Sequence, residues 1–324
     1  MAEMYQNDQD TTPKVTAVIV TFQSRDTIGE VLEIFQDLHQ QNSADVVVTD
    51  NNSTDGTADF IAQAYPFVQL IRNRENIGFG RGCNCGFDFA RTPYILLINP
   101  DAKIDKDSLD ILMDFMEAHP RVGICGPAVV DESGALQPSG GSPTPWKAAI
   151  KPLLPGLASR GQRSIIPGET PRATDWICGS VMLLRSQMIK EIGGFDPRFF
   201  LYFEETDMCR RAMKAGWEIW TVGTAVAGHV NAASAKSTSA EMIWGTISEH
   251  YFRSRLYFFR KHFGLPAAVF AEIGELCSML LRAALDLLRG RTYKHLRPRL
   301  RAPILKFPDV PKSDTGVSLK CRKR

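Results

Sequence analysis

The chain has 324 residues, of which 44% are hydrophobic and 23% are charged, so we expect a globular protein with a substantial core. Its net charge of +2 conceals an acidic body and a basic tail, because the segment from Arg282 to Arg324 holds 13 Lys and Arg residues against 3 Asp and Glu. The seven cysteines form no CxxC pair, which argues against a structural zinc site.

The first residues, MAEMYQNDQDTTPK, are polar and acidic and do not have the pattern of a signal peptide. We therefore expect a disordered N-terminus over residues 1–13 and a cytoplasmic location. We expect no nucleic-acid partner.

From residue 15 to residue 130, short apolar runs alternate with segments of helical spacing. The predicted strands are 15–22, 46–49, 68–72, 94–98 and 123–130, and the predicted helices are 28–38, 57–65, 78–91 and 108–118. This alternation predicts an α/β fold with a mostly parallel central sheet that is flanked by helices.

The alternation ends at a segment rich in Gly, Pro and Ser, residues 133–172, which reads as a long mobile loop or lid. Regular structure is predicted to resume with a strand at 176–185, a short helix at 188–192, a late strand at 219–226 and a helix at 246–262.

The run VVVTDNNSTDG, residues 46–56, places a carboxylate at the end of a buried strand. In open parallel sheets, ligands bind beyond the carboxyl ends of the strands, so Asp50 and Asn51 are candidates for nucleotide binding. An Asx-rich turn before a helix explains the same residues without a ligand.

A second candidate follows the strand YILLI, where Asn99-Pro100-Asp101 begins. A nucleoside diphosphate needs a divalent cation to offset its charge, and Mg²⁺ and Mn²⁺ prefer oxygen ligands such as Asp101. His229, just after the late strand, is of interest as a ligand if it joins Asp101. A turn with a solvated or helix-capping aspartate is the alternative.

The third candidate is the segment FFLYFEETDMCRR, residues 199–211. Acidic residues in the first turn of a helix suit its dipole, which is a purely structural explanation. It does not explain why Glu204 and Glu205 stand side by side after aromatic residues. Adjacent carboxylates in an apolar setting have raised pKa values and make usable bases.

The glycine-rich run NIGFGRG, residues 76–82, does not match the dinucleotide fingerprint GxGxxG. We interpret it either as a tight loop beside a bound diphosphate, with Arg81 as a contact, or as a glycine-rich entry to a helix.

An ordered set of motifs in this chain resembles the family 2 glycosyltransferases of GT-A fold, especially their rhamnosyltransferase-like branch. The motifs are VTAVIVTFQS, VVVTDNNSTDGT, NRENIGFGRGCNCGFDFA, YILLINPDA, the long segment from DWICGS to KAGW, and His229. The resemblance covers roughly residues 15–261. It implies a GT-A domain over residues 14–263 and an inverting transfer of a sugar from a nucleoside-diphosphate-sugar to a hydroxyl of a glycan or lipid-linked acceptor, in polysaccharide synthesis for the cell envelope.

The resemblance also implies roles for particular residues. Donor contacts fall on Thr21, Asp50, Asn51, Arg81, Asn99 and Asp101, the cation falls on Asp101 and His229, and the base is Glu205, with Glu204 as second choice. The motif after the fourth strand begins with Asn99 where the family has an acidic residue, so Asn99 offers only a neutral amide oxygen.

The C-terminal extension, residues 264–324, combines an amphipathic helix with the basic tail. On the helix at 267–288, five polar residues form one stripe: Glu272, Glu275, Ser278, Arg282 and Asp286. The rest of the helix is apolar. Four charges argue against a membrane span. The apolar face suits an anionic membrane surface, or packing on the catalytic domain or a second copy of the chain.

Two other classes of function compete with a glycosyltransferase. A sugar-nucleotidyltransferase would have a basic glycine-rich loop after the first strand, where this chain has Phe22-Gln23-Ser24-Arg25. A non-catalytic module that binds nucleotides or glycans has no need of the pair Glu204-Glu205, although the pair does not exclude it.

Overall fold

The computed structural model describes residues 13–229 and 246–308. The predicted disordered start lies outside the described residues except for Pro13, and so does the end of the predicted basic tail, residues 309–324.

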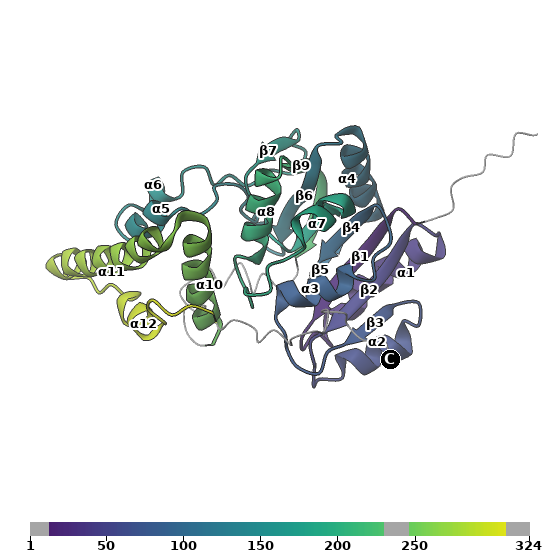
Figure 1. The fold of residues 1–324 in the computed structure, drawn as a ribbon, viewed down its shortest axis with the longest axis horizontal. Coiled ribbons are helices and arrows are strands. Elements are labelled where there is room, and N and C mark those ends of the chain that lie inside the picture. The colour runs from purple at the N-terminus through teal and green to yellow at the C-terminus, as the bar shows by residue number, and fades with distance from the viewer. Residues whose placement is uncertain (1–12, 230–245, 309–324) are drawn as a thin grey trace, which may run out of the picture.

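A mixed β-sheet forms the centre of the molecule (Figure 1). In the described ranges it has nine strands, in the order β3-β2-β1-β4-β8-β6-β9-β5, with β7 paired to β9. Their bounds are β1 Val15–Thr21, β2 Ala44–Asp50, β3 Gln69–Arg72, β4 Tyr94–Ile98, β5 Ala102–Ile104, β6 Val122–Asp131, β7 Arg172–Thr174, β8 Val181–Arg185 and β9 Glu218–His229.

The sheet is parallel from β3 through β2 and β1 to β4, as the alternating pattern predicts. Beyond β4 it is mixed, because β8 runs antiparallel to both β4 and β6, whereas β9 runs parallel to β6. The short strands β5 and β7 are both antiparallel to β9. The carboxyl ends of β1, β2 and β4 therefore meet at one edge, which is where the candidate residues lie.

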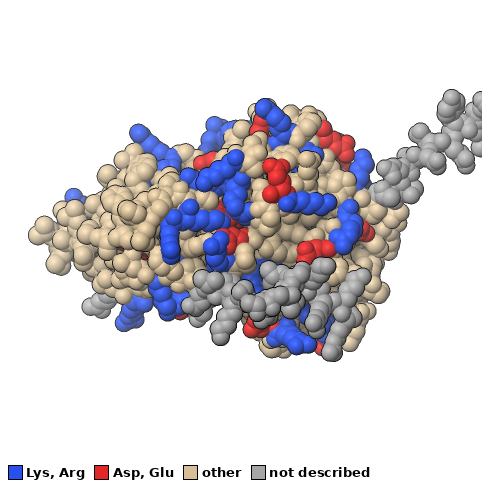
Figure 2. All heavy atoms as spheres, in the orientation of Figure 1, with Lys and Arg blue, Asp and Glu red and all other residues tan. Residues whose placement is uncertain are grey.

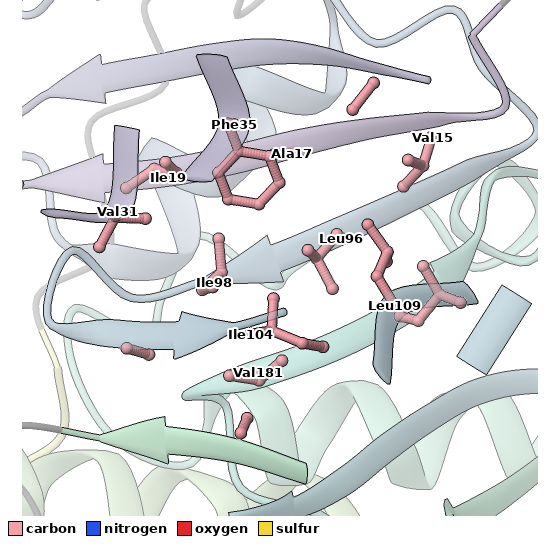
Figure 3. Close-up of a cluster of buried hydrophobic side chains, with 14 of the residues drawn as sticks. Val15, Ala17, Ile19, Val31, Phe35, Leu96, Ile98, Ile104, Leu109 and Val181 are labelled. Atoms are coloured by element: carbon pink, nitrogen blue, oxygen red, sulfur yellow. The ribbon is translucent and has the colours of Figure 1, made fainter. Parts of the chain in front are cut away.

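Some helices cover the two faces of the sheet, and others lie at one end of the molecule (Figure 1). Their bounds are α1 Ile28–Gln40, α2 Thr57–Ala64, α3 Phe79–Phe87, α4 Lys106–Ala118, α5 Pro145–Ile150, α6 Pro155–Ala158, α7 Ser186–Ile192, α8 Glu204–Lys214, α10 Thr246–Phe263, α11 Leu265–Leu288 and α12 Leu296–Arg301. One core places Phe35 of α1 and Leu109 of α4 on the sheet (Figure 3). The core on the other face contains Cys83 of α3 and Met208 of α8.

Two strands differ clearly from their predicted bounds. The strand predicted at 176–185 begins only at Val181, because its partner β4 ends at Ile98, which faces Val181. The late strand continues to His229, since β5 and β6 extend its pairing. His229 is therefore the last residue of β9 and does not follow it.

The segment 133–172, predicted as a loop, contains the two short helices α5 and α6. Pro145 and Pro155 each stand in the first turn of one of them. Proline is favoured at that position because the first helical N–H groups need no intrahelical partner, so the prolines that read as loop residues begin helices here.

The C-terminal helices form a separate projection. Gly264, with φ +87°, ends α10 and redirects the chain into α11. Phe258 and Phe259 of α10 share a third apolar core with Ala268 and Ala271 of α11. In Figure 1, α11, α5, α6 and α12 lie together at one end of the molecule, and α10 lies between them and the sheet. Whether residues 264–324 form a separate unit stays a prediction.

Candidate active site

The carboxylate of Asp50 is buried at the end of β2 and holds the loop that follows. Its Oδ1 accepts hydrogen bonds from Thr21 Oγ1 at 2.9 Å and Ser53 Oγ at 2.6 Å, and its Oδ2 accepts one from the Ser53 backbone N–H at 2.9 Å. Two predicted donor-binding residues, Thr21 and Asp50, are thus in direct contact. The carboxylate is oriented by β1 and by its own loop.

Asn51 joins this loop to the glycine-rich run. Its side chain donates to the carbonyl of Gly78 at 3.1 Å and accepts from Asn73 Nδ2 at 2.8 Å. The run itself enters helix α3, which agrees with the helix-entry interpretation. Arg81, on the first turn of α3, has a buried Nε with no hydrogen-bond partner in the structure. Its guanidinium is therefore not fully committed to the fold.

Asp101 and His229 are brought together by the pairing of β5 with β9. Asp101 precedes β5, and His229 faces Ala102 in the ladder. Asp101 Oδ1 lies 3.0 Å from His229 Nε2. Asn99 lies on the same turn, and its backbone N–H donates to the carbonyl of Ser180 at 2.9 Å.

Two buried side chains, Gln137 and Ser180, hold His229 in place through hydrogen bonds. Its Nδ1 lies 2.6 Å from Gln137 Nε2, and Gln137 Oε1 accepts from Ser180 Oγ at 2.6 Å. His229, Gln137 and Ser180 are all buried. The orientation of the Gln137 amide sets the tautomer of His229. An amide N–H that faces Nδ1 leaves the proton on Nε2, whereas an amide carbonyl that faces Nδ1 leaves a lone pair on Nε2.

These side chains fit a divalent cation. Two adjacent ligands of an octahedral ion with bonds of ~2.1 Å are about 3 Å apart, which is the separation of Asp101 Oδ1 from His229 Nε2. Within residues 13–229 and 246–308, no group of three His, Cys, Asp or Glu side chains gathers. Further ligands would then come from phosphate oxygens and water, as is usual for Mg²⁺.

The acidic pair begins α8 after an unusual stretch of backbone. Tyr202 and Phe203 both have positive φ, 68° and 69°, which non-glycine residues rarely adopt. Their aromatic rings pack against Tyr251 of α10, which holds this conformation in place. The turn directs the two following carboxylates into different surroundings.

Glu204 faces inward. A Cβ built on Gly80 would lie 3.5 Å from the Cβ of Glu204, and the Oε2 of Glu204 is buried without a hydrogen-bond partner. Burial, followed by the charge of Glu205, raises the pKa of Glu204 well above its usual value. This carboxylate lies between α3 and α8.

Glu205 is only partly buried and faces Gly179, where a Cβ would lie 3.6 Å from its own. The next residue, Ser180, bonds both to the Asn99 backbone and to Gln137, which contacts His229, so a short chain of contacts connects the surroundings of Glu205 with those of His229. Burial raises the pKa of Glu205 to about 7. Such a group is a base near neutral pH.

Asp207, also acidic and in the first turn of α8, is fully committed to the fold. Its carboxylate accepts from Arg211 Nε at 2.6 Å and lies 2.8 Å from His262 Nε2 and 2.5 Å from Lys261 Nζ. Burial alone would raise the pKa of Asp207, but the hydrogen bond from His262 and the charges of Arg211 and Lys261 together lower it. It joins α8 to α10 and is no candidate for the base.

Sequence reasoning missed Gln137 and Ser180. Gln137 lies in the Gly- and Pro-rich segment, where no periodicity marks single residues, and Ser180 lies in ICGS, which reads as part of a strand. The only signal in the sequence was their polar character beside apolar runs. Their role depends on β8 and residue 137 meeting the end of β9.

Comparison with known proteins identifies the family and the fold. The model of the family described as glycosyl transferase family 2 matches residues 16–193. The N-acetylglucosaminyl-diphospho-decaprenol L-rhamnosyltransferase of Mycobacterium tuberculosis (strain H37Rv) is 31% identical over a 199-residue alignment, and the match covers 56% of this chain and 64% of that protein. The chain thus aligns with slightly less than two thirds of this relative. Rhamnosyltransferase WbbL of Escherichia coli (strain K12) is 24% identical over 62% of this chain and 78% of its own.

Solved structures share the fold. The mannosyltransferase PcManGT of Pyrobaculum calidifontis, in complex with GDP-Man and Mn²⁺, aligns with a TM-score of 0.57 at 16% identity, over 86% of this chain and 75% of its own. The S. aureus TarS 1-349 structure aligns with a TM-score of 0.51 at 14% identity, over 88% and 89%. These similarities assign the GT-A fold. With the matched family model covering more than half of its residues, the chain belongs to glycosyl transferase family 2.

Proposed function

We propose that the protein is an inverting glycosyltransferase. It moves a sugar from a nucleoside-diphosphate-sugar to a hydroxyl of a glycan or lipid-linked acceptor in polysaccharide synthesis. The observation that carries this proposal is Glu205, a partly buried carboxylate beside Gly179 whose pKa is raised to about 7 by burial. A non-catalytic binding module has no use for such a group.

The chemistry follows from these positions. A hydroxyl is a poor nucleophile, so Glu205 accepts its proton as the acceptor oxygen attacks the anomeric carbon. A bond forms between these two atoms, and the bond from the anomeric carbon to the diphosphate oxygen breaks. Attack from the face opposite the leaving group inverts the anomeric centre, and no covalent enzyme intermediate is needed.

We assign donor binding to the edge formed by β1, β2 and β4. Asp50 and Asn51, with Thr21 behind them, are placed for the nucleoside, while Arg81 and Asn99 are assigned to the diphosphate or sugar. Asp101 and His229 are assigned to Mg²⁺ or Mn²⁺, which neutralises charge on the leaving diphosphate. The Mn²⁺ complex of the structurally similar mannosyltransferase supports this choice of cofactor.

The relatives suggest the substrate class. Two carry rhamnosyltransferase in their names, and one of these names a diphospho-decaprenol acceptor. We infer a rhamnosyl or other hexosyl donor and a lipid-linked acceptor at the cytoplasmic face of a membrane. No helix among the described residues is long and apolar enough to cross a bilayer.

The first experiment tests the base. Glu205→Gln keeps the size of the side chain and removes its basicity, so turnover is expected to fall by roughly 100-fold or more with little change in donor affinity. Glu33→Gln, on the exposed side of α1, is the matched control. Release of nucleoside diphosphate with transfer of the sugar to an acceptor separates this function from nucleotidyl transfer and from simple binding. Near-normal turnover of the Glu205 variant would refute its role.

The second experiment tests the cation by calorimetric titration of donor with and without Mn²⁺. Asp101→Ala is expected to abolish the metal-dependent part of donor affinity, and His229→Ala to weaken it. Donor affinity that is indifferent to Mn²⁺ in the unmodified protein would contradict the assignment of Asp101 and His229.

A further inference from the structure

Helix α11 is turned so that its polar stripe faces the protein and much of its apolar side faces solvent. Glu272 and Asp286 are buried together with Ala268, Ala271 and Met279. The exposed apolar side chains of the helix, here called the α11 surface, include Leu287 at 75% and Leu288 at 85% exposure; the others are Leu265, Phe270, Ile273, Leu280, Leu281 and Leu285.

This orientation is fixed by buried ion pairs. Glu272 Oε1 accepts from Arg255 Nε of α10 at 3.0 Å, and Glu272 also pairs with Arg299 of α12. Glu275 pairs with the same two arginines, at 2.8 Å each. Rolling α11 to bury its leucines would break these pairs and leave two arginines buried without partners, which is strongly destabilising.

Neighbouring elements extend the apolar exposure. Helix α5 packs against α11 so closely that a Cβ on Gly274 would meet the Cβ of Ala149 at 2.6 Å. Trp146 of α5 is exposed, as are Leu154 and Leu157 beside and within α6. After α11, Leu300, Ile304 and Leu305 are exposed as well. An apolar exposure of this extent marks an interaction site.

The exposed charged side chains of this region are all of one sign. All acidic residues of the described segment 265–308 face inward or pair with arginine: Glu272, Glu275 and Asp286. The exposed charged side chains of that segment are basic: Arg289, Arg291, Lys294, Arg301 and Lys306. In Figure 2, the end of the molecule that carries α11 is largely uncharged, with Lys and Arg near its margins.

We propose that the α11 surface docks the protein on an anionic membrane. Exposed leucines insert among the lipid chains while the basic residues meet the negative headgroups, which is the arrangement of interfacial helices. Two copies of the segment would present no exposed acidic side chain to each other, so the charges favour a lipid surface over self-association through this face.

Docking would also orient the active site. Ser254 of α10 donates to the carbonyl of Leu201 at 2.9 Å, and Phe258 packs against Phe203, next to the acidic pair. Helix α10, which leads into α11, is thus fixed to the turn that precedes α8. A lipid-linked hydroxyl would reach Glu205 from a defined direction. The docking itself does not depend on transfer chemistry.

The test is sedimentation of the full chain with vesicles, without donor or acceptor. Vesicles of phosphatidylcholine with phosphatidylglycerol should capture the protein at low salt, at least about tenfold more strongly than vesicles of phosphatidylcholine alone, and high salt should remove most of this preference.

Two variants locate the surface. Leu287→Asp/Leu288→Asp changes two nearly fully exposed side chains, so folding should be preserved, and capture should fall at least about tenfold. Ile166→Asp is its control, because Ile166 is exposed at 57% outside the α11 surface. Arg289→Glu/Arg291→Glu should lose the preference for anionic lipid, whereas Lys190→Glu on α7 should keep it.

Two results would overturn the proposal. One is equal capture of the Leu287→Asp/Leu288→Asp variant and the unmodified protein. The other is a dimer, seen by light scattering without vesicles, that this variant dissociates while neither form binds vesicles, which would make the face a contact between copies. Loss of transfer activity in either form would bear on the proposed function and leave the docking result intact.

Discussion

Glu204 and Glu205 are adjacent in the chain yet lie in different surroundings. The positive φ angles of Tyr202 and Phe203 start α8 abruptly, so one carboxylate is directed between α3 and α8 and the other toward Gly179. An unpartnered inner carboxylate is costly to ionise, and it remains protonated more readily than its neighbour. Charge at neutral pH therefore belongs first to Glu205.

The raised pKa of Glu205 predicts a pH profile. A base acts only when it is deprotonated, so kcat/KM is expected to rise with pH on an acid limb with an apparent pKa of about 7 and then to level off. Initial rates at fixed Mn²⁺ from pH 5 to 9, about two units either side, would measure it. A flat profile down to pH 5 would contradict Glu205 as the base.

Gln137 is expected to position His229 without touching substrate. Gln137→Leu removes the hydrogen bond to Nδ1, so metal-dependent donor affinity should fall by roughly 10- to 100-fold, as for other partners of metal ligands. Donor affinity without Mn²⁺ should stay unchanged, which separates this effect from a general loss of structure. Gln137→Glu, whose carboxylate accepts from Nδ1–H, should restore part of the affinity. Equal losses with and without Mn²⁺ would indicate a structural role only.

At the scale of elements, the sequence predicts what local pattern determines. The first strands and helices fall within a few residues of their predicted bounds, because their apolar spacing and the burial in the sheet agree. The start of β8 and the end of β9 were missed, since each is set by the length of a pairing strand. The two short helices α5 and α6 were missed because their prolines also occur in loops.

The sequence also does not predict which face of α11 is buried. Its polar stripe was correctly read as one stripe, but a stripe that carries Glu272 and Glu275 normally faces water. Here it faces inward, because Arg255 and Arg299 come from helices on either side and neutralise it. Which face of an amphipathic helix is buried depends on partners that are distant in the chain.

The stability that Glu275 gives to this orientation of α11 depends on pH. Burial would raise its pKa, but the charges and hydrogen bonds of Arg255 and Arg299 lower it to about 2. A depressed pKa means that the ionised form stabilises the fold above the unfolded value of about 4.3, and that this contribution is lost as pH falls toward 2.

Glu275→Gln is therefore expected to lower the free energy of unfolding by on the order of 3 kcal/mol at pH 7, and by progressively less below about pH 4. Urea denaturation of both proteins at pH 7, 5 and 3.5, spanning roughly that range, measures the difference. Glu117→Gln is a suitable control, since its pair with Lys14 is exposed and surface pairs contribute little. A pH-independent difference would show that the effect is packing.

For the molecule as a whole, the candidate site is assembled from segments that lie far apart in the chain. Asp101 meets His229, and Asn99 meets Ser180, only because β5 pairs with β9 and β8 lies beside β4. The order of motifs identified the family, and the site residues that the resemblance implies stay predictions. The buried partners that hold those residues follow from strand order, which single-sequence patterns do not determine.

Helix α10 joins the C-terminal helices α11 and α12 to the catalytic sheet and depends on them for its packing. A chain that ends at Gly264 loses α11 and α12, so Phe258 and Phe259 lose the packing of Ala268 and Ala271. Arg255 is then left buried beside Phe252 without either of its glutamate partners. Removing the partners of a buried charge costs about 3–5 kcal/mol, and the exposed aromatic surface adds to that cost.

We therefore expect the shortened chain to melt at least about 5 °C below the full chain and to lose donor affinity as α10 loosens its hold on the turn before Glu204. Calorimetric melting and donor titration, with Leu287→Asp/Leu288→Asp as the control that alters α11 without removing it, measure both effects. Equal melting and equal donor affinity would show that residues 265–308 are an independent appendage, and that docking could not be transmitted through α10 to the active site.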